Sequence, residues 1–248
     1  MSEIPKNLVF FGHHKCGSRL FRKVIMRGLA RANDLEVIEY KIQDPPFHFE
    51  ILHDLDFENI DFTALGKAQN IHLNLSNAGV PVVQAVKAHL KAFKGVHVIR
   101  DPRQILVSSY FHHLEGHPEE NGKWYWDRLA YDRRILKSLN LEKGVLYELD
   151  NITRDIIENQ ILPWETDDRI LELKLEDINA KFDAVVADLV EFLDLKTKPY
   201  LEISFGSTFV NANSQRWQDV FTPRIKAIFK ERYGQLLVDL GYEKTLDW

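Results

Sequence analysis

The feature that most constrains the fold is a glycine-bounded loop near the N-terminus, between an apolar run and an amphipathic segment. Residues 7–11 form a short apolar run that stops at Gly12, which is the pattern of a buried parallel strand. From Ser18 onward, residues suited to one buried helix face recur at helical spacing: Leu20, Phe21, Val24, Ile25, Gly28, Leu29 and Ala32. The sequence therefore predicts a strand, a tight loop and a helix, in that order.

The loop 12–18 has the glycine spacing of a nucleotide phosphate loop, G-x-x-x-x-G. In the ATP- and GTP-binding version, the second glycine is followed by Lys and then Ser or Thr, which hold the outer phosphates and Mg²⁺. Here Ser18 and Arg19 follow Gly17, and the lysine lies inside the loop at Lys15. The loop thus predicts an anion bound by backbone amides and Lys15 without metal, as suits a phosphate–sulfate anhydride. A plain strand-to-helix turn is the alternative.

Composition excludes several classes of function. The chain of 248 residues carries 32 Lys and Arg against 37 Asp and Glu, so its net charge favours neither nucleic acid nor an anionic membrane as partner. Its single cysteine, Cys16, excludes an internal disulfide and suits a reducing compartment. No apolar run has the length of a membrane span or the form of a signal-peptide core. We expect a cytoplasmic protein with one domain over residues 1–248.

Strand and helix patterns alternate along the rest of the chain. Strands are predicted at 36–40, 81–89, 95–99 and 169–175, and helices from Pro102 onward and at 124–139, 142–160, 181–193 and 223–240. This alternation predicts an α/β fold, a parallel sheet with helices on both faces. Ligands bind such sheets beyond the carboxyl ends of the strands.

Two further pairs of residues are expected at that edge. Arg100 ends a predicted strand, and Ser108 lies on the following helix, on a face away from its apolar stripe. The two are positioned to bind one phosphate, although a salt bridge to a carboxylate is the alternative for Arg100. If 82–89 is a strand, Lys87 and His89 point to one face near its carboxyl end. A histidine there is a plausible general base for an alcohol.

Five segments resemble the sulfotransferases of cytosolic and bacterial type that use 3′-phosphoadenylyl sulfate (PAPS), and the first three have the order of the family's motifs. Residues 15–19 are similar to the family's 5′-phosphosulfate loop, and residues 86–90 (VKAHL) to its Lys-Thr-His-Leu segment with the catalytic base. Residues 100–113 resemble the 3′-phosphate motif, 173–178 a further shared strand, and 216–222 the C-terminal tryptophan region. The resemblance implies a P-loop-NTPase-like fold and in-line transfer of a sulfuryl group to an acceptor hydroxyl.

The resemblance also implies roles for particular residues. Lys15 stabilises the leaving phosphate, and the other donor contacts in the loop come from Cys16, Gly17, Ser18 and Arg19. Arg100 and Ser108 bind the 3′-phosphate, and Arg216 substitutes there for an Arg-Lys-Gly that this chain lacks. His89 takes the acceptor proton, and Lys87 adds positive charge at the transferring group. PAPS is the donor co-substrate, and no metal is implied.

The chain departs from the family at Leu20, where an aromatic residue usually stacks on adenine, and it lacks the Thr-Val pair of the usual dimerisation motif. The acceptor is expected to be a small or hydrophobic alcohol or phenol, with a protein, a glycan or a carrier-bound group as the alternative. Several aromatic residues are suited either to its pocket or to the core: Phe47, Phe49, Phe57, Phe62, Trp124, Tyr125 and Trp126.

Three other functions remain open. A phosphate-binding module without catalysis shares the loop. A cysteine phosphatase would use Cys16 and Arg22, which have the C-x5-R spacing. A small-molecule kinase is disfavoured by Ser18 in the place of the lysine. The remaining histidine groups, 13/14 and 112/113/117, lack a matched carboxylate or thiolate set for zinc. His14 is expected to line the site and the others to be surface or supporting residues.

Overall fold

The sheet lies at the centre of the computed structural model, which describes residues 7–38, 67, 71–76, 79–90, 92–116, 127–201 and 216–248. Five parallel strands are ordered β2-β3-β1-β4-β5. They are β1 (Asn7–Gly12), β2 (Glu36–Ile38), β3 (Ile71–Ser76), β4 (Phe93–Ile99) and β5 (Ile170–Lys174). Because β1 lies between β3 and β4, the strand order reverses at its carboxyl end, where ligands bind in open α/β sheets.

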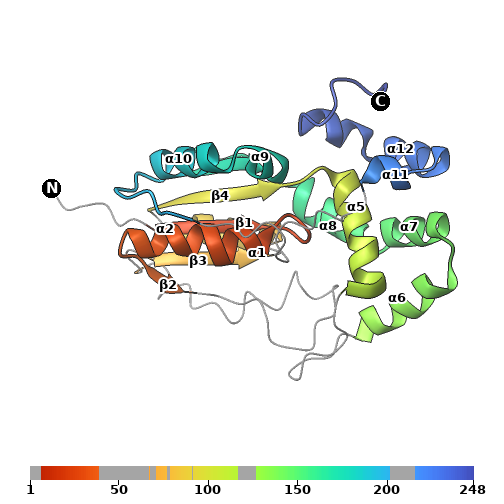
Figure 1. The fold of residues 1–248 in the computed structure, drawn as a ribbon, viewed down its shortest axis with the longest axis horizontal. Coiled ribbons are helices and arrows are strands. Elements are labelled where there is room, and N and C mark those ends of the chain that lie inside the picture. The colour runs from red at the N-terminus through yellow and green to blue at the C-terminus, as the bar shows by residue number, and fades with distance from the viewer. Residues whose placement is uncertain are drawn as a thin grey trace.

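Helices cover the sheet and continue beyond one end of it (Figure 1). The helices after β1, β3 and β4 are α1 (Ser18–Leu20), η1 (Phe21–Met26), α2 (Arg27–Ala32), α4 (Val80–His89), α5 (Pro102–Phe111) and η3 (His112–Gly116). Between η3 and β5 lie α6 (Asp127–Ser138), α7 (Leu141–Asp150), α8 (Ile152–Ile156) and η4 (Ile157–Ile161). The last helices are α9 (Leu175–Ala180), α10 (Phe182–Phe192), α11 (Trp217–Val220) and α12 (Pro223–Asp239).

Alternation along the central strands separates the two faces of the sheet. Leu8 and Phe10 pack with the first helical segment, α9 and α10, whereas Val9 and Phe11 pack with α4. A third apolar cluster joins α5, α7, α8 and α12 beyond the carboxyl ends of β1 and β4. The structure thus confirms the predicted parallel α/β sheet with helices on both faces.

The strand predicted at 81–89 is wrong, because this segment is helix α4. Gly79 is its N-cap and a proline lies in its first turn, both helix-start signals. Its buried residues Val83, Val86 and Leu90 recur at intervals of three and four, the spacing of a helix face. The missing strand is β3, which has no counterpart among the predicted strands although Ile71, Leu73 and Leu75 alternate into the core.

The other predicted bounds of helices and strands differ less from those in the structure. The helix predicted at 142–160 is interrupted at Asn151, whose backbone leaves the helical region (φ −120°, ψ −108°) between α7 and α8. The candidate pocket aromatics at 47–62 and 124–126 lie outside the described residues. Among the helices of the described ranges, none is both long and apolar enough to cross a membrane.

Candidate functional site

The phosphate loop, residues 12–18, closes on itself at the end of the central strand. The His13 carbonyl accepts hydrogen bonds from the Cys16 amide (3.2 Å) and the Ser18 hydroxyl (2.9 Å). Gly17 has φ 74° at the start of α1, a left-handed conformation that glycine adopts without strain. A Cβ at Gly12 would lie 2.9 Å from the Ser18 hydroxyl. Both glycines of the motif are therefore required by the turn.

Two cations meet at this loop. Arg100, directly after β4, donates from Nη1 to the Lys15 carbonyl oxygen at 3.0 Å. Burial, followed by the nearby Arg100 charge, lowers the pKa of Lys15 to about 8. Burial also lowers the pKa of Arg100. Two positive charges held together away from water are stabilised when an anion binds between them. The structure thus brings together the two cations that the sequence predicted at this edge.

Cys16 does not have the properties of a nucleophile. Its side chain is fully buried, and burial is the main cause that raises the pKa of its thiol to about 12. A phosphatase cysteine needs a lowered pKa, because the thiolate is the attacking species. The burial of the thiol and its raised pKa therefore argue against the hypothesis of a Cys16-dependent phosphatase. Cys16 contributes packing at the loop.

We expect Cys16 to resist alkylation in the folded protein. With iodoacetamide at pH 8, intact-mass measurement should show no adduct on the native protein over a time in which the guanidinium-unfolded protein is fully modified, because a buried neutral thiol is both inaccessible and unreactive. Modification of the native protein at a rate near that of a free thiol would contradict this account of Cys16.

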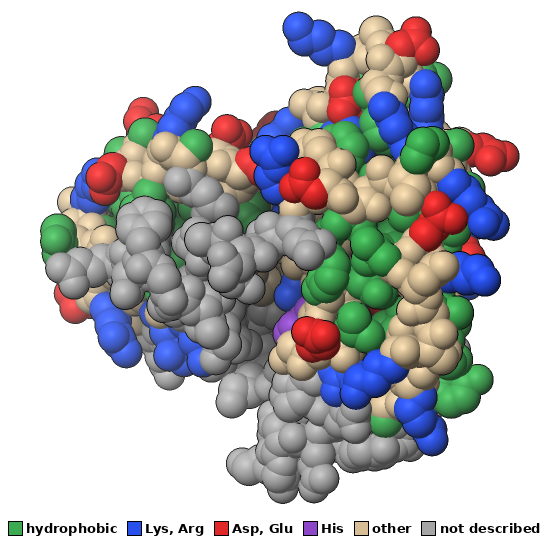
Figure 2. Space-filling model, turned by 45° about the vertical axis from the view of Figure 1, so that its right-hand side comes forward, with side chains coloured by type: hydrophobic (Ala, Val, Ile, Leu, Met, Phe, Trp, Pro, Cys, Tyr) green, Lys and Arg blue, Asp and Glu red, His purple; other side chains and the backbone are tan. Residues whose placement is uncertain are grey.

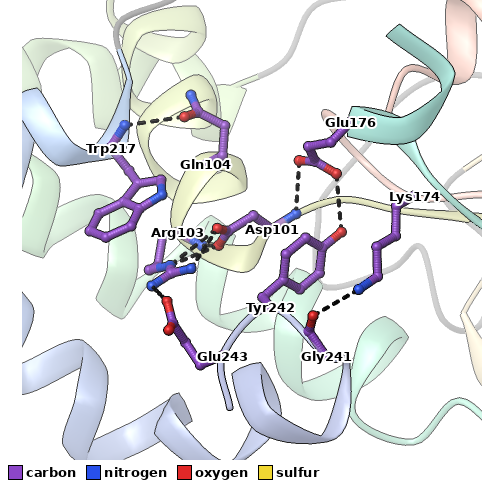
Figure 3. A network of polar contacts seen from close by, with 9 residues as sticks. All are labelled: Asp101, Arg103, Gln104, Lys174, Glu176, Trp217, Gly241, Tyr242 and Glu243. Carbon is purple, nitrogen blue, oxygen red and sulfur yellow. Dashed lines mark hydrogen bonds and ion pairs between the residues drawn. The ribbon is translucent and has the colours of Figure 1, made fainter. Parts of the chain in front are cut away.

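The turn after β4 that positions Arg100 is held by a polar network (Figure 3). Asp101 caps α5 by accepting from the Arg103 amide at 2.9 Å, and the Arg103 guanidinium returns to the same carboxylate at 2.8 Å. That guanidinium also pairs with Glu243 and stacks over Trp217 (4.0 Å to the ring centroid) and Trp248 (4.6 Å). Asp101 is thereby tied to the last residues of the chain.

Glu176 at the start of α9 holds the same turn from the other side. Its two carboxylate oxygens accept from the Asp101 amide (3.2 Å) and the Tyr242 hydroxyl (3.1 Å). Lys174, at the end of β5, donates to the Gly241 carbonyl at 3.0 Å. The C-terminal segment therefore supports the strand end that carries Arg100 (Figure 3). Local sequence patterns do not reveal this support, because its partners are far apart in the chain.

Ser108 and Arg216 lie on elements that pack together. Ser108 is half-buried on α5, and Gln104, one turn earlier, accepts from the Trp217 amide at 3.1 Å. Arg216 precedes Trp217 with a side chain that is 71% exposed, 3.4 Å from Asp219. Of the contacts among the described residues, none joins Ser108 or Arg216 directly to Arg100.

Arg19 has its backbone in α1, and its side chain lies outside the described parts of the structure.

The expected placement of Lys87 and His89 beside the loop is wrong. Helix α4 connects the carboxyl end of β3 to the amino end of β4, and these strands are parallel, so α4 ends at the edge of the sheet opposite the phosphate loop. His89 is exposed at that end. The Lys87 Nζ instead lies 3.5 Å from the Asp167 carboxylate and 3.3 Å from the Glu165 carbonyl, before the start of β5.

Replacing His89 with alanine should leave any activity at the loop unchanged, within about twofold, because surface changes far from a site have little effect. The comparison is of kcat and KM between the wild type and the variant. A loss of more than about tenfold in kcat, equivalent to about 1.4 kcal/mol of barrier, would restore His89 as a candidate base and contradict its placement here.

The histidines that do reach the loop are different ones. The His14 ring lies 5.2 Å from that of His113, nearly parallel to it, and 5.9 Å from that of His112. His14 and His112 are half-buried, whereas His113 is fully buried with Nδ1 3.0 Å from the Glu148 carboxylate. Figure 2 shows a histidine beside a basic side chain where this face of the molecule is hollowed.

Three histidines expected at the surface or in a supporting position differ in burial. His13 and His113 are fully buried, which excludes a surface role for them, and His112 is half-buried. His117 lies outside the described residues. Within the described ranges, no three His, Cys, Asp or Glu side chains are grouped as ligands of a metal ion.

Comparisons with known proteins agree with the architecture. No family model matches the sequence, and no curated protein matches it. A mouse sulfotransferase crystallised with PAP aligns over 94% of this chain and 84% of its own, with TM-score 0.50 and 12% identity. A sulfotransferase from Alicyclobacillus acidocaldarius aligns over 95% and 94%, with TM-score 0.49 and 12% identity. A sugar kinase from Janibacter aligns over 77% and 96%, with TM-score 0.42 and 12% identity.

Proposed function

We propose, from the sulfotransferase fold and the two cations at the phosphate loop, that the protein transfers a sulfuryl group from PAPS to an acceptor hydroxyl. The observation that carries this proposal is the contact of Arg100 with the Lys15 carbonyl at 3.0 Å. It joins the end of β4 to the loop after β1. A donor with phosphate groups on both its 5′ and 3′ positions offers one anion to Lys15 and another to Arg100.

The Lys15 side chain and the backbone amides of the loop have different roles at the 5′ end of the donor. The amides of Gly17, Ser18 and Arg19, at the start of a helix, bind the phosphosulfate. Lys15 neutralises the charge that develops on the leaving phosphate as the S–O bond breaks. Its lowered pKa of about 8 leaves it mostly protonated at neutral pH. Cys16 packs beneath the loop. The chemistry needs no metal, because the lysine supplies the positive charge.

Arg100 binds the 3′-phosphate through its planar guanidinium. Ser108, from the next helix, adds a hydroxyl, and Arg216 adds charge at the rim of the site. Their placement is supported by the bond between Gln104 and the Trp217 amide, which joins α11 to the face of α5 that carries Gln104. This arrangement distinguishes PAPS from nucleotides without a 3′-phosphate.

The proton of the acceptor hydroxyl is taken by a histidine next to the loop, in place of His89. His14 and His112 are half-buried, with rings 5.9 Å apart, and His14 directly precedes Lys15. An imidazole has its pKa in the range needed for a base near neutral pH. Single asparagine variants of His14 and His112 identify which one acts: the variant of the base loses kcat and the acidic limb of its pH profile but still binds PAP.

The acceptor class remains the one expected from the sequence, a small or hydrophobic alcohol or phenol, acted on in the cytoplasm by a single domain. The test is a transfer assay with ³⁵S-labelled PAPS and a panel of phenols and aliphatic alcohols, with EDTA present. Labelled product that needs Lys15 supports the proposal. PAP binding without transfer to any acceptor in the panel would favour the phosphate-binding module, and absence of PAP binding would contradict both.

A further inference from the structure

A chain of hydrogen-bonded polar side chains, buried except at its Glu172 end, runs beneath the phosphate loop. His13 Nε2 lies 2.6 Å from His97 Nε2, which belongs to the neighbouring strand β4. The other nitrogen of His13 is 3.2 Å from the Gln160 side-chain oxygen, and the other nitrogen of His97 is 3.0 Å from the Glu172 carboxylate. His13, His97 and Gln160 are at most 1% exposed. Side chains from the loop after β1, from β4, from η4 and from β5 thus meet, and only the Glu172 end, with a side chain 39% exposed, reaches water.

The strand geometry explains why these two histidines meet. Val9, Phe11 and His13 alternate onto one face of the sheet, and His97 is in register with Phe11 on the adjacent parallel strand. Trp164 stacks on His97, with ring centroids 3.6 Å apart and planes 17° apart. The pair is therefore enclosed by aromatic and apolar groups.

The hydrogen-bond partners of His13 and His97 fix where each ring carries its hydrogen. Burial is the main cause that lowers the pKa of both His13 and His97 to about 3, and the charge of Lys87 adds to the effect on His97, so both rings are neutral. A carboxylate only accepts, hence His97 carries its hydrogen on Nδ1 and accepts at Nε2. His13 must then donate from Nε2 and accept at Nδ1, where Gln160 has to supply a donor.

The Gln160 side chain meets this requirement once its amide is turned over. As placed, its oxygen faces His13, while its nitrogen is buried without a hydrogen-bond partner. The oxygen and nitrogen of an amide have nearly the same shape, so their assignment follows from the hydrogen-bond network. With nitrogen toward His13, Gln160 donates to His13, His13 to His97, and His97 to Glu172, and the orphaned nitrogen is satisfied.

We infer that His13 and His97, held as single neutral tautomers between Gln160 and Glu172, are positioning residues of the phosphate loop. The carbonyl of His13 accepts from the Cys16 amide and the Ser18 hydroxyl, and the His13 ring is fixed at both nitrogens. This chain of four polar side chains therefore sets the position of His13, the residue on which the loop closes. The expected effect of these four side chains on catalysis rests on the proposed function. Their expected effect on the position of the loop does not.

The first test needs no activity. In ¹⁵N spectra of the histidine-labelled full-length protein at pH 7, His13 is expected as the neutral tautomer protonated on Nε2 and His97 as the neutral tautomer protonated on Nδ1, with no change down to about pH 5. An imidazolium at either position, the opposite tautomers or rapid tautomer exchange would overturn the inference.

The second test uses two substitutions of His13. The amide of His13→Gln can still donate toward His97, whereas His13→Leu removes the donor and leaves His97 Nε2 unsatisfied. In His13→Leu, exchange of the Cys16 amide should be faster and PAP should bind about tenfold more weakly, the effect of one lost buried hydrogen bond. His13→Gln should recover most of both. Equal exchange and PAP binding in wild type and His13→Leu would contradict a positioning role.

The two tests separate this inference from the proposed function. If the wild type fails to bind PAP, the tautomers and the Cys16 exchange rate still decide whether the chain holds the loop. If His13→Leu does not fold, which thermal melting and circular dichroism will show, the tautomers of the wild type decide the inference. The matched control is His89→Leu, which changes an exposed histidine at the opposite edge and should alter neither readout.

Discussion

Replacing Lys15 with methionine should lower kcat/KM for sulfuryl transfer by about 10²–10³-fold, the usual cost of removing one group that stabilises charge in a transition state. Methionine keeps the length and apolar character of the lysine stem and removes the ammonium that is proposed to face the leaving phosphate. Because the developing charge is greater than the ground-state charge, most of the loss should be in kcat.

The pH dependence of the wild type provides a second measure of Lys15. Its pKa is lowered to about 8 by burial and by Arg100, so the charged form is present below that pH and is lost as the pH rises through it. PAP affinity should therefore fall by up to about tenfold per pH unit above pH 8, and Lys15→Met should abolish this dependence. Lys137→Met, at an exposed helix position, is the matched control. Transfer by Lys15→Met with kcat/KM within about tenfold of the wild type would contradict the role of this residue.

Replacing Arg100 with alanine should weaken PAP binding by about 10²-fold, because a hydrogen-bonded charge pair with phosphate contributes about 3 kcal/mol. The loss should be much smaller for 5′-AMP, which lacks the 3′-phosphate. Arg100→Lys should recover only part of the affinity, since an ammonium lacks the planar fork that binds a phosphate through two parallel bonds. Calorimetric titration of both nucleotides against each variant measures the difference.

The control for Arg100 is Arg154→Ala, which removes an exposed arginine from α8 and should leave both affinities unchanged. Arg100 also donates to the Lys15 carbonyl, so the loop itself should loosen in Arg100→Ala, and some affinity for 5′-AMP should be lost as well. Equal losses for the two nucleotides would mean that Arg100 only holds the loop and does not contact the 3′-phosphate.

Local patterns carried the prediction of the central part of the fold. The strand, the glycine-bounded turn and the helix around Lys15 lie within one continuous segment, and the glycine spacing reports a backbone requirement that the structure shows at Gly12 and Gly17. The position of Arg100 at a strand end was predicted in the same way, because Asp101 and Pro102 mark the start of α5. These signals depend on neighbouring residues only.

The segment around His89 shows where a local pattern misleads. Its β-branched valines favour a strand, but the helix signals at Gly79 and Pro81 and the face that packs on β1 and β3 prevail over intrinsic preference. The consequence for the site was large, because a strand ending at His89 would reach the loop, whereas a helix ending there lies at the opposite edge of the sheet.

The contact between His13 and His97 was beyond local reasoning for another reason. The two residues are 84 positions apart in the chain. Their contact depends on the register of two parallel strands, and register is set by the packing of the whole sheet. The support of Asp101 by Glu176 and of Arg103 by Glu243 is equally remote in sequence. Such pairs become visible only when the strand order is known.

The most direct test of a donor site with two phosphate positions is the titration of the wild-type protein with PAP and with 5′-AMP in EDTA. The arrangement of Lys15 and Arg100 predicts that PAP binds without metal, and at least about tenfold more tightly than 5′-AMP, which corresponds to about 1.4 kcal/mol for the 3′-phosphate. Equal affinities, or PAP binding that appears only when Mg²⁺ is added, would contradict it.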